Sequence, residues 1–318
     1  MKIAGFAINA DAAKVDGSPD TLREELDYYA RLGFPYVEIA PHGAGVMFNG
    51  RLNKERMKGL LALLAGYPFR YVVHGPNPMN LMNMEAGDVE RRMFISTIEF
   101  TAALGAGVMV YHAGRFLPEE KFLLPGAVMP SLKVQKAMLD MERSLLGEMG
   151  DLAARYGVTI AVENARPFLD ASPYCYGEFL DQLGAVIREI NHPRVGVTLD
   201  LGHAYLAACH YHFDLLDEVE AVAPYVRHIH LHDNFGKICA SYEKKQAEMA
   251  ATGRGDMHLP VGWGEIPAGD ALARLNNFNG VITLEMRPRY SAFYGEALAN
   301  ARALVYGGDR ERKGELNE

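Results

Sequence analysis

Residues 226–237 read VRHIHLHDNFGK and place His228, His230 and His232 at alternating positions. Successive side chains of a β-strand point to opposite faces, so these three rings are expected to face the same way. Side chains on one face of a strand are spread along its axis, so a single strand rarely completes a metal site. The stretch therefore predicts a strand whose histidines act together with residues from other strands.

Seven other short runs, rich in β-branched and apolar residues, resemble this strand, and longer segments with helical periodicity lie between them. Eight parallel strands are the number that closes an α/β barrel, which commonly forms a single domain. In chain order the predicted strands are KIAGFAI, PYVEIA, RYVVH, GVMVYH, GVTIAVEN, RVGVTLD, VRHIHLH and GVITLEM. We therefore predict an α/β fold, a single-domain (β/α)8 barrel over residues 1–306, followed by a charged flexible tail over residues 307–318.

The segments between the strands carry helix start and stop signals. Ser18 precedes an amphipathic segment that Gly33 ends, and the segments 87–107 and 138–157 also end in glycine. Two long connections, residues 114–131 and 233–265, follow the fourth and seventh strands, where barrels place functional loops. We expect the second connection to cover the barrel mouth, with hinges at its glycines.

Composition narrows the classes of partner. The chain of 318 residues has 32 Lys and Arg against 40 Asp and Glu, a formal net charge of -8, which disfavours non-specific attraction to nucleic acid or anionic membranes. Three cysteines without a CxxC pair fit a reducing compartment. No secretory signal or membrane-spanning run is evident. We expect a cytoplasmic protein with a small-molecule substrate, and the sequence is compatible with a homo-oligomer.

Six successive predicted strands end in a residue type that binds metals. Parallel barrel strands deliver their carboxyl ends to one mouth, so these side chains should converge although they are far apart in sequence. Buried carboxylates and imidazoles are costly to leave unpaired, and one divalent cation satisfies several of them. The six residues are His74, His112, Glu163, Asp200, His230 and Glu285.

The residue types limit the metal. A set of Glu163, Asp200, His230 and Glu285 offers mainly oxygen with one imidazole, which suits manganese, cobalt, magnesium or zinc and excludes thiolate-rich structural zinc sites. His228 and His232 would then lie beside the site or at its rim. Three further residues fit either an additional metal or substrate role or a purely structural one: His203, Asp256 and His258.

Taken together, YVEIA, VVHGPNPMNL, YHAG, AVEN, TLDLGHAY, HIHLHDN, HLPVGWGEI and ITLEMRP resemble, in order, the motifs of the xylose isomerase-like barrel superfamily. This superfamily contains sugar isomerases and epimerases and the endonuclease IV type of DNA repair enzyme. The resemblance implies that Glu163, Asp200, His230 and Glu285 hold the shared metal. It also implies that Glu163 and Glu285 move protons on opposite faces of the substrate.

The resemblance extends to the additional ligands of endonuclease IV, which holds three zinc ions. Those ligands would fall on His74, His112, His203, Asp256 and His258. Two features favour the sugar branch instead. Strand two carries Glu38 in YVEIAPHG, in the manner of sugar enzymes, and the chain lacks obvious basic, aromatic-tipped loops of the kind that open a DNA duplex.

Two enzymatic hypotheses follow. The first is a divalent-metal-dependent isomerase or epimerase acting on a small sugar or polyhydroxy carbonyl compound through an enediolate, with Glu163 and Glu285 as acid and base and His203 or Lys237 binding a hydroxyl. A related dehydratase is a variant of it. The second is a zinc-dependent phosphodiesterase acting on abasic DNA. A barrel that binds a sugar-like ligand without turning it over is the non-enzymatic alternative.

Overall fold

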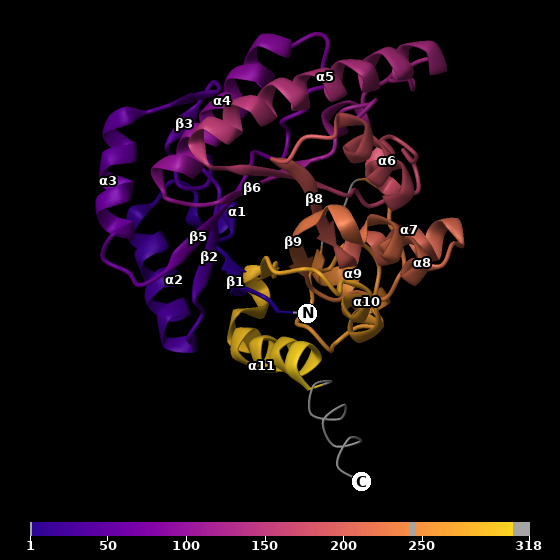
Figure 1. Cartoon of the computed structure of the whole chain (residues 1–318). Helices are drawn as coiled ribbons and strands as arrows, with labels where there is room; N and C mark the ends of the chain where they lie inside the picture. The colour runs from indigo at the N-terminus through magenta and orange to yellow at the C-terminus, as the bar shows by residue number, and fades with distance from the viewer. Residues whose placement is uncertain (1, 242–245, 308–318) are drawn as a thin grey trace.

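The computed structural model describes residues 2–241 and 246–307, and these residues form a closed barrel of eight parallel strands surrounded by helices (Figure 1). The barrel strands, in chain order, are β1 (Gly5–Asn9), β2 (Tyr36–Ile39), β5 (Arg70–His74), β6 (Val108–His112), β7 (Thr159–Glu163), β8 (Val195–Asp200), β9 (Val226–Leu231) and β10 (Val281–Leu284). All eight predicted strands are therefore present. The (β/α)8 architecture predicted from the sequence is confirmed.

The barrel closes because β1 pairs with both β2 and β10, in the order β1-β10-β9-β8-β7-β6-β5-β2. The parallel register places His112 beside Glu163 on β6 and β7, and Asp200 beside His230 on β8 and β9. Residues that end neighbouring strands are thus brought to one level of the barrel. Of the charged tail predicted over residues 307–318, all but Gly307 lies outside the described residues.

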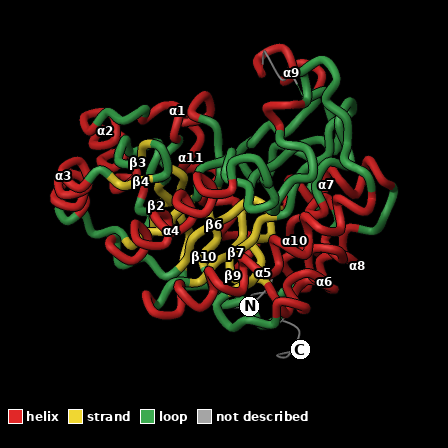
Figure 2. The backbone as a smooth tube through the Cα atoms, turned by 90° about the horizontal axis from the view of Figure 1, so that it is seen from above, coloured by secondary structure: helices red, strands yellow, loops and turns green. Residues whose placement is uncertain are grey.

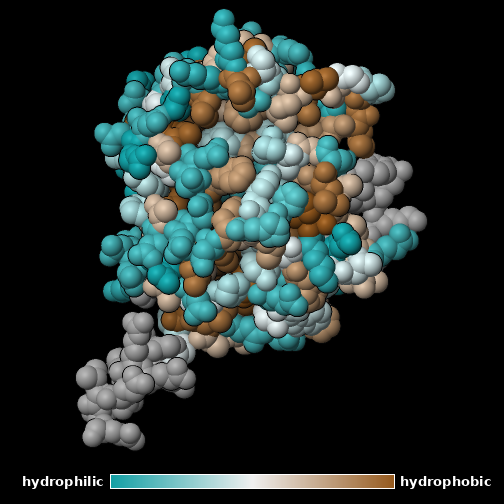
Figure 3. Space-filling view, turned by 90° about the vertical axis from the view of Figure 1, so that its right-hand side faces the viewer, coloured by the Kyte–Doolittle hydropathy of each residue, from teal (hydrophilic) through white to brown (hydrophobic). Residues whose placement is uncertain are grey.

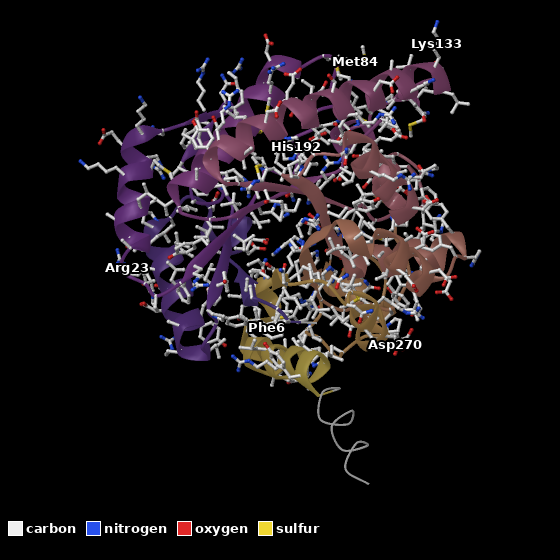
Figure 4. The ribbon with its side chains drawn as sticks, in the orientation of Figure 1. Phe6, Arg23, Met84, Lys133, His192 and Asp270 are labelled. Carbon is white, nitrogen blue, oxygen red and sulfur yellow. The ribbon has the colours of Figure 1, made fainter. Side chains whose placement is uncertain are left out.

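Helices cover the outside of the barrel. The α-helices of the described residues are α1 (Ala12–Val15), α2 (Pro19–Leu32), α3 (Lys54–Leu64), α4 (Gly87–Ala103), α5 (Leu132–Tyr156), α6 (Leu180–Ile190), α7 (Leu201–Tyr211), α8 (Leu215–Val222), α9 (Gln246–Thr252), α10 (Ala268–Arg274) and α11 (Tyr294–Tyr306). Four short 3-10 helices lie in the connections, at Glu119–Lys121, Tyr176–Glu178, Ala223–Tyr225 and Pro288–Phe293. Phe6 of β1 is buried, whereas Arg23 of α2 and Lys133 of α5 are exposed on the outer layer (Figure 4).

The predicted start and stop signals operate in α2. The Ser18 hydroxyl accepts the Thr21 N–H at the start of the helix, and Gly33 ends it at a φ of 78°. Both observations are the expected cap geometries, since glycine enters the left-handed region without a Cβ penalty. The helix buries Leu22, Leu26 and Tyr29 against the barrel, which explains its amphipathic pattern.

One feature was not predicted, a short hairpin of β3 (Met47–Phe48) and β4 (Arg51–Leu52) that follows β2. Its turn is Asn49-Gly50, with φ of 48° and 70°. Two positive φ angles are what a two-residue hairpin turn requires, and Asn-Gly is its commonest sequence. The signal for this hairpin was therefore present in the sequence.

The long connections lie at the carboxyl ends of the strands. Figure 2 shows α9 and the loops around it on the side of the barrel opposite the N-terminus. The outer face in Figure 3 is mainly hydrophilic, with smaller hydrophobic patches between. Among the described residues, no helix is both long enough and apolar enough to cross a lipid bilayer.

Candidate metal centre and active site

The four residues predicted as principal metal ligands converge at the carboxyl ends of β7, β8 and β9 and just beyond β10. Ligand atoms of Glu163, Asp200, His230 and Glu285 all lie within 4.8 Å of one another. Nδ1 of His230 is 3.1 Å from Glu163 Oε1, 3.4 Å from Glu285 Oε2 and 3.7 Å from Asp200 Oδ2. The first three residues are almost fully buried and Glu285 is partly buried. The arrangement is a compact, oxygen-rich donor set.

A second cluster lies beside the first and contains His203, His232, Asp256 and His258, again with ligand atoms within 4.8 Å of one another. Asp256 Oδ2 is 2.7 Å from His258 Nε2 and 3.3 Å from His203 Nε2. Nε2 of His232 lies 3.2 Å from Asp200 Oδ2, which joins the two clusters. His232, expected beside the site or at its rim, is therefore a buried member of it.

Two local backbone features make room for this second cluster. A Cβ at Gly202 would lie 2.0 Å from Cε1 of His232, so only glycine permits that approach. His258 adopts a φ of 45°, which is costly for a residue with a Cβ and is commonest where function requires it. Both features show that the chain tolerates local constraints to bring these histidines together.

His74 and His112 approach the principal site from β5 and β6. Their Nε2 atoms lie 3.4 Å and 3.1 Å from Oε2 of Glu163. Ligand atoms of His74, Glu163 and His230 form a further group within 4.8 Å. Nδ1 of His112 faces the guanidinium of Arg115 at 3.2 Å. All nine residues predicted as metal ligands, principal and additional, thus lie in one connected cluster.

Glu38 of β2 lies beneath this cluster, inside the barrel. Its Oε2 atom is 3.1 Å from His230 Nε2, 3.2 Å from His228 Nε2 and 3.1 Å from the Thr283 hydroxyl. Glu38 is 2% exposed, and its three partners are fully buried. Glu38 was noted in the sequence as a feature of sugar enzymes but was not predicted as a site residue. A glutamate in the middle of an apolar strand was the available signal.

The buried carboxylates remain ionised because histidines surround them. Burial by itself raises the pKa of Glu163, but His112 and His230 outweigh it and hold the pKa well below its usual value. Burial likewise raises the pKa of Asp200, but His203 and His232 lower it to about 2. Both carboxylates are therefore ionised near neutral pH.

The histidines respond in the opposite direction. Burial lowers the pKa of His203, but Asp200 and Asp256 raise it to about 10. Burial also lowers the pKa of His74, but the Glu163 carboxylate raises it to about 9. The raised pKa values favour the protonated imidazoles, which act as cationic partners of the carboxylates. A divalent cation can take the same role.

Several buried polar atoms of the site lack a partner, which tests whether the residues fit a metal. Within the described part of the chain, no hydrogen bond of normal geometry reaches His74 Nε2, Glu163 Oε2, Glu285 Oε2 or Asp256 Oδ1. Unsatisfied buried polar atoms are costly in a folded protein unless an ion or water completes them. The donor types are those that manganese, cobalt, magnesium and zinc accept. The residues fit a divalent metal.

The cluster forms the floor of a cavity of about 620 Å³ at the barrel mouth. A volume of this order suits a small organic ligand. His42 also lines this cavity. Lys237, expected to bind a substrate hydroxyl, is exposed and is not among the lining residues. Its carbonyl accepts the Gly255 N–H at 2.7 Å, so its backbone closes the base of the loop.

Three arginines of the cavity wall were missed by sequence reasoning. Arg166 pairs with Asp256 at 3.1 Å. Arg115 lies 3.6 Å from Glu119, and Arg287 also lines the cavity. Each arginine follows a strand-end ligand by two or three residues, which is the signal that identifies them.

Comparison with known proteins places this geometry in context. The family model described as xylose isomerase-like TIM barrel matches residues 26–305. A relative from Methanocaldococcus jannaschii, "Uncharacterized protein MJ1311", is 27% identical over 273 residues, which is 84% of this chain and 80% of that protein.

Solved structures with the same fold include a D-tagatose 3-epimerase-like protein, with a TM-score of 0.70, 22% identity and coverage of 96% of this chain and 99% of that one. A D-psicose 3-epimerase solved in the presence of D-fructose has a TM-score of 0.66 and 14% identity, with coverage of 95% of this chain and 99% of that one. The IOLI protein with a bound zinc atom has a TM-score of 0.63 and 17% identity, with coverage of 95% of this chain and 97% of that one. At these identities the likeness shows the fold alone.

Proposed function

Because the chain belongs to the xylose isomerase-like TIM barrel family, we propose that it is a divalent-metal-dependent isomerase or epimerase of a small sugar or related polyhydroxy carbonyl compound. The observation that carries this proposal is the convergence of Glu163 and Glu285 with Asp200 and His230, all with ligand atoms within 4.8 Å. Two carboxylates next to one cation site, at the floor of a cavity, can act as acid and base in proton transfer at the carbon next to a carbonyl.

Glu163, Asp200, His230 and Glu285 would hold the metal, which would be manganese, cobalt, magnesium or zinc. When bound, the metal would supply positive charge next to the oxygens of a carbonyl and an adjacent hydroxyl, which makes the neighbouring C–H more acidic. His203, Asp256 and His258 of the second cluster then border the space left for the substrate.

The two glutamates carry the proton transfers in this proposal. One removes the proton from the carbon beside the carbonyl, and the other returns a proton to the resulting enediolate of the substrate. Their environments differ, since Glu163 is 1% exposed among histidines whereas Glu285 is partly exposed to the cavity. Different environments separate the proton affinities of two carboxylates, which allows one to act as a base and the other as an acid.

The related structures support this choice of chemistry. Among them are a D-psicose 3-epimerase and a D-tagatose 3-epimerase-like protein, and the IOLI protein carries zinc. We also propose a cytoplasmic location, since no disulfide joins the three cysteines in the described structure and a reducing compartment suits such thiols.

A panel of ketoses, hydroxypyruvate and inososes tests the proposal. The protein is assayed with added manganese or cobalt, and we expect at least one compound to be isomerised or epimerised. Glu163→Gln and Glu285→Gln should each lower turnover by about 10²-fold or more, the contribution expected of a general acid or base. Glu25→Gln, a change at another buried glutamate that contacts Tyr29 and Lys14, is the matched control and should retain turnover.

If no compound of this class is turned over, the sugar proposal is wrong. Ligand binding that survives Glu163→Gln, without any turnover by the wild type, would favour a barrel that only binds a sugar-like molecule.

A second candidate function is metal-dependent phosphodiester hydrolysis at abasic DNA. The specific observation in its favour is that His203, Asp256 and His258 form a cluster of their own beside the principal site, and that His74 and His112 both face Glu163. A site with this many ligands has room for more than one ion.

Metal content distinguishes the two functions. The hydrolase predicts three tightly held zinc ions, cleavage of an abasic duplex and DNA affinity that falls steeply with salt. One ion per chain and an uncut abasic duplex would exclude it.

A further inference from the structure

Each nitrogen of the His230 ring faces a different carboxylate environment. Nδ1 faces the site, where Glu163 Oε1 lies at 3.1 Å and Glu285 Oε2 at 3.4 Å. Nε2 faces away from it, toward Oε2 of Glu38 at 3.1 Å. His230 is fully buried, so water does not compete for either nitrogen.

A neutral imidazole carries its single proton on one of its two nitrogens, and only the other nitrogen offers a lone pair to a metal. If Nδ1 carried the proton, His230 would present an N–H to the three carboxylates of the site and would not be a ligand. An acceptor fixed at Nε2 selects the tautomer that leaves Nδ1 free. Glu38 is in the position of that acceptor.

Glu38 reaches this position across the barrel. It lies on β2, which is separated from β9 in the barrel by β1 and β10. Three groups hold the same Glu38 oxygen, namely the rings of His228 and His230 and the hydroxyl of Thr283. Thr283 Oγ1 also lies 2.9 Å from His228 Nε2, so the acceptor is fixed by a buried network rather than by one contact.

We propose that Glu38 is a positioning residue for the metal site, which holds the proton of His230 on Nε2 and thereby directs the Nδ1 lone pair toward Glu163, Asp200 and Glu285. Carboxylates that accept the second N–H of a ligating histidine fix the orientation of the ring and raise its basicity. The inference rests on the metal site of the proposed function and is independent of the substrate.

Direct ligation by Glu38 is the alternative that the test must separate, because ligand atoms of Glu38, His74 and Glu285 also lie within 4.8 Å of one another. A positioning role predicts weaker affinity with an unchanged number of bound ions. A ligand role predicts that one ion is lost when Glu38 is replaced.

The first measurement is the affinity and stoichiometry of Zn²⁺ and Mn²⁺, each added alone to the metal-free protein, by chelator competition and elemental analysis. We expect Glu38→Gln to weaken metal binding by roughly 10- to 100-fold with unchanged stoichiometry, the usual cost of losing such a partner. Glu38→Ala should weaken it further, because glutamine keeps an acceptor oxygen and alanine does not.

Glu25→Gln is the matched control. It makes the same change at another buried glutamate, whose contacts are with Lys14 and Tyr29 and not with the residues of the metal site. Affinity within about threefold of the wild type is expected. Circular dichroism and thermal unfolding of each variant establish that it is folded.

The second measurement reports the proton itself. In zinc-loaded protein labelled with 15N-histidine, the His230 ring, assigned by its loss in His230→Gln, should show a protonated Nε2 and an unprotonated Nδ1. A proton on Nδ1, unchanged affinity in Glu38→Gln, or the loss of one ion in that variant would each overturn the inference. Absence of metal binding by the wild type would overturn the metal site itself, together with the proposed function.

Discussion

Glu142 is a buried carboxyl group that supports the site from outside the barrel. It lies on α5, is fully buried, and its Oε1 atom accepts the Gly114 N–H at 3.0 Å, two residues beyond His112. Burial raises the pKa of Glu142 to about 7 in spite of this hydrogen bond and one from Tyr176. The group is therefore neutral in the folded protein at mildly acidic pH.

A pH dependence of stability follows from this raised pKa. The folded protein binds the proton more tightly than the unfolded chain, whose pKa is near 4.5, so the contribution is complete below that pH and is lost as pH rises through about 7. Relative to Glu142→Gln, the wild type should lose about 3 kcal/mol of unfolding free energy between pH 4 and pH 8. Urea unfolding of both proteins across this range measures it. A constant difference between them would contradict the assignment.

Single residues also show what sequence reasoning captured in the site and what it missed. The strand-end rule identified His74, His112, Glu163 and Asp200, because register in a parallel barrel turns a position in sequence into a position in space. It did not assign Glu38 to the site. Its interaction with His230 crosses the barrel interior, and no local pattern on β2 or β9 encodes which strand faces which.

At the scale of elements, β8 and α7 meet at a residue with two functions. Asp200 ends β8, and its Oδ1 atom accepts the His203 N–H at 2.7 Å as the N-cap of α7, while Oδ2 faces His232 and His230. Asn is as good an N-cap as Asp, whereas alanine cannot cap.

In metal-free protein, Asp200→Ala should therefore be less stable than Asp200→Asn by about 1 kcal/mol, the usual value of such a cap. Both variants should bind metal more weakly than the wild type. Denaturant unfolding in the presence of EDTA checks the first statement. Equal stability of the two variants would show that the cap contributes nothing measurable.

The connection after β9, residues 233–265, is predicted to cover the barrel mouth, and this stays a prediction. Residues 242–245 of the connection lie outside the described residues. The two ends of the connection are joined by an isolated β-bridge between the backbones of Lys237 and Arg254, and the Gly255 N–H donates a hydrogen bond to the Lys237 carbonyl. Gly236, Gly253 and Gly255 all have positive φ, which supports the expected turns at the two ends. Asp256 and His258 follow directly and reach the site.

Deleting Ser241 to Thr252 tests the cover. The closed base should keep Asp256 and His258 in place and leave the fold intact, while turnover falls by roughly tenfold to 100-fold, the scale expected when groups around the substrate are misplaced. Kinetics and metal content are measured together. Unchanged kinetics in a well-folded deletion variant would show that this segment is a surface loop without a role in turnover.

Helix boundaries show where local patterns stop being informative. Helical periodicity marks residues 138–157, but α5 begins at Leu132, which is 81% exposed. The first turns of α5 bury little apolar surface, so they lack the periodic stripe from which helices are recognised. The hairpin of β3 and β4 was missed for another reason, since its strands have only two residues each.

At the scale of the whole molecule, the barrel was predictable because its strands are apolar runs, separated by helices with clear caps, and their number is the number that closes. The family match over residues 26–305 agrees with that prediction. The choice among chemistries is set by a few side chains and the ions they hold, because one fold carries many functions. The convergence of the candidate ligands was therefore predictable from sequence, whereas the substrate was not.

The central claim is that metal-assisted proton transfer beside a carbonyl takes place at this mouth. The most direct test is solvent exchange: the manganese- or cobalt-loaded protein is incubated in D₂O with each compound of the substrate panel, and the recovered substrate and product are analysed by NMR and mass spectrometry. Deuterium at the carbon next to the carbonyl is predicted in the turned-over compound, with none after EDTA treatment or in Glu163→Gln and Glu285→Gln. Turnover of any compound without entry of solvent deuterium would contradict the account.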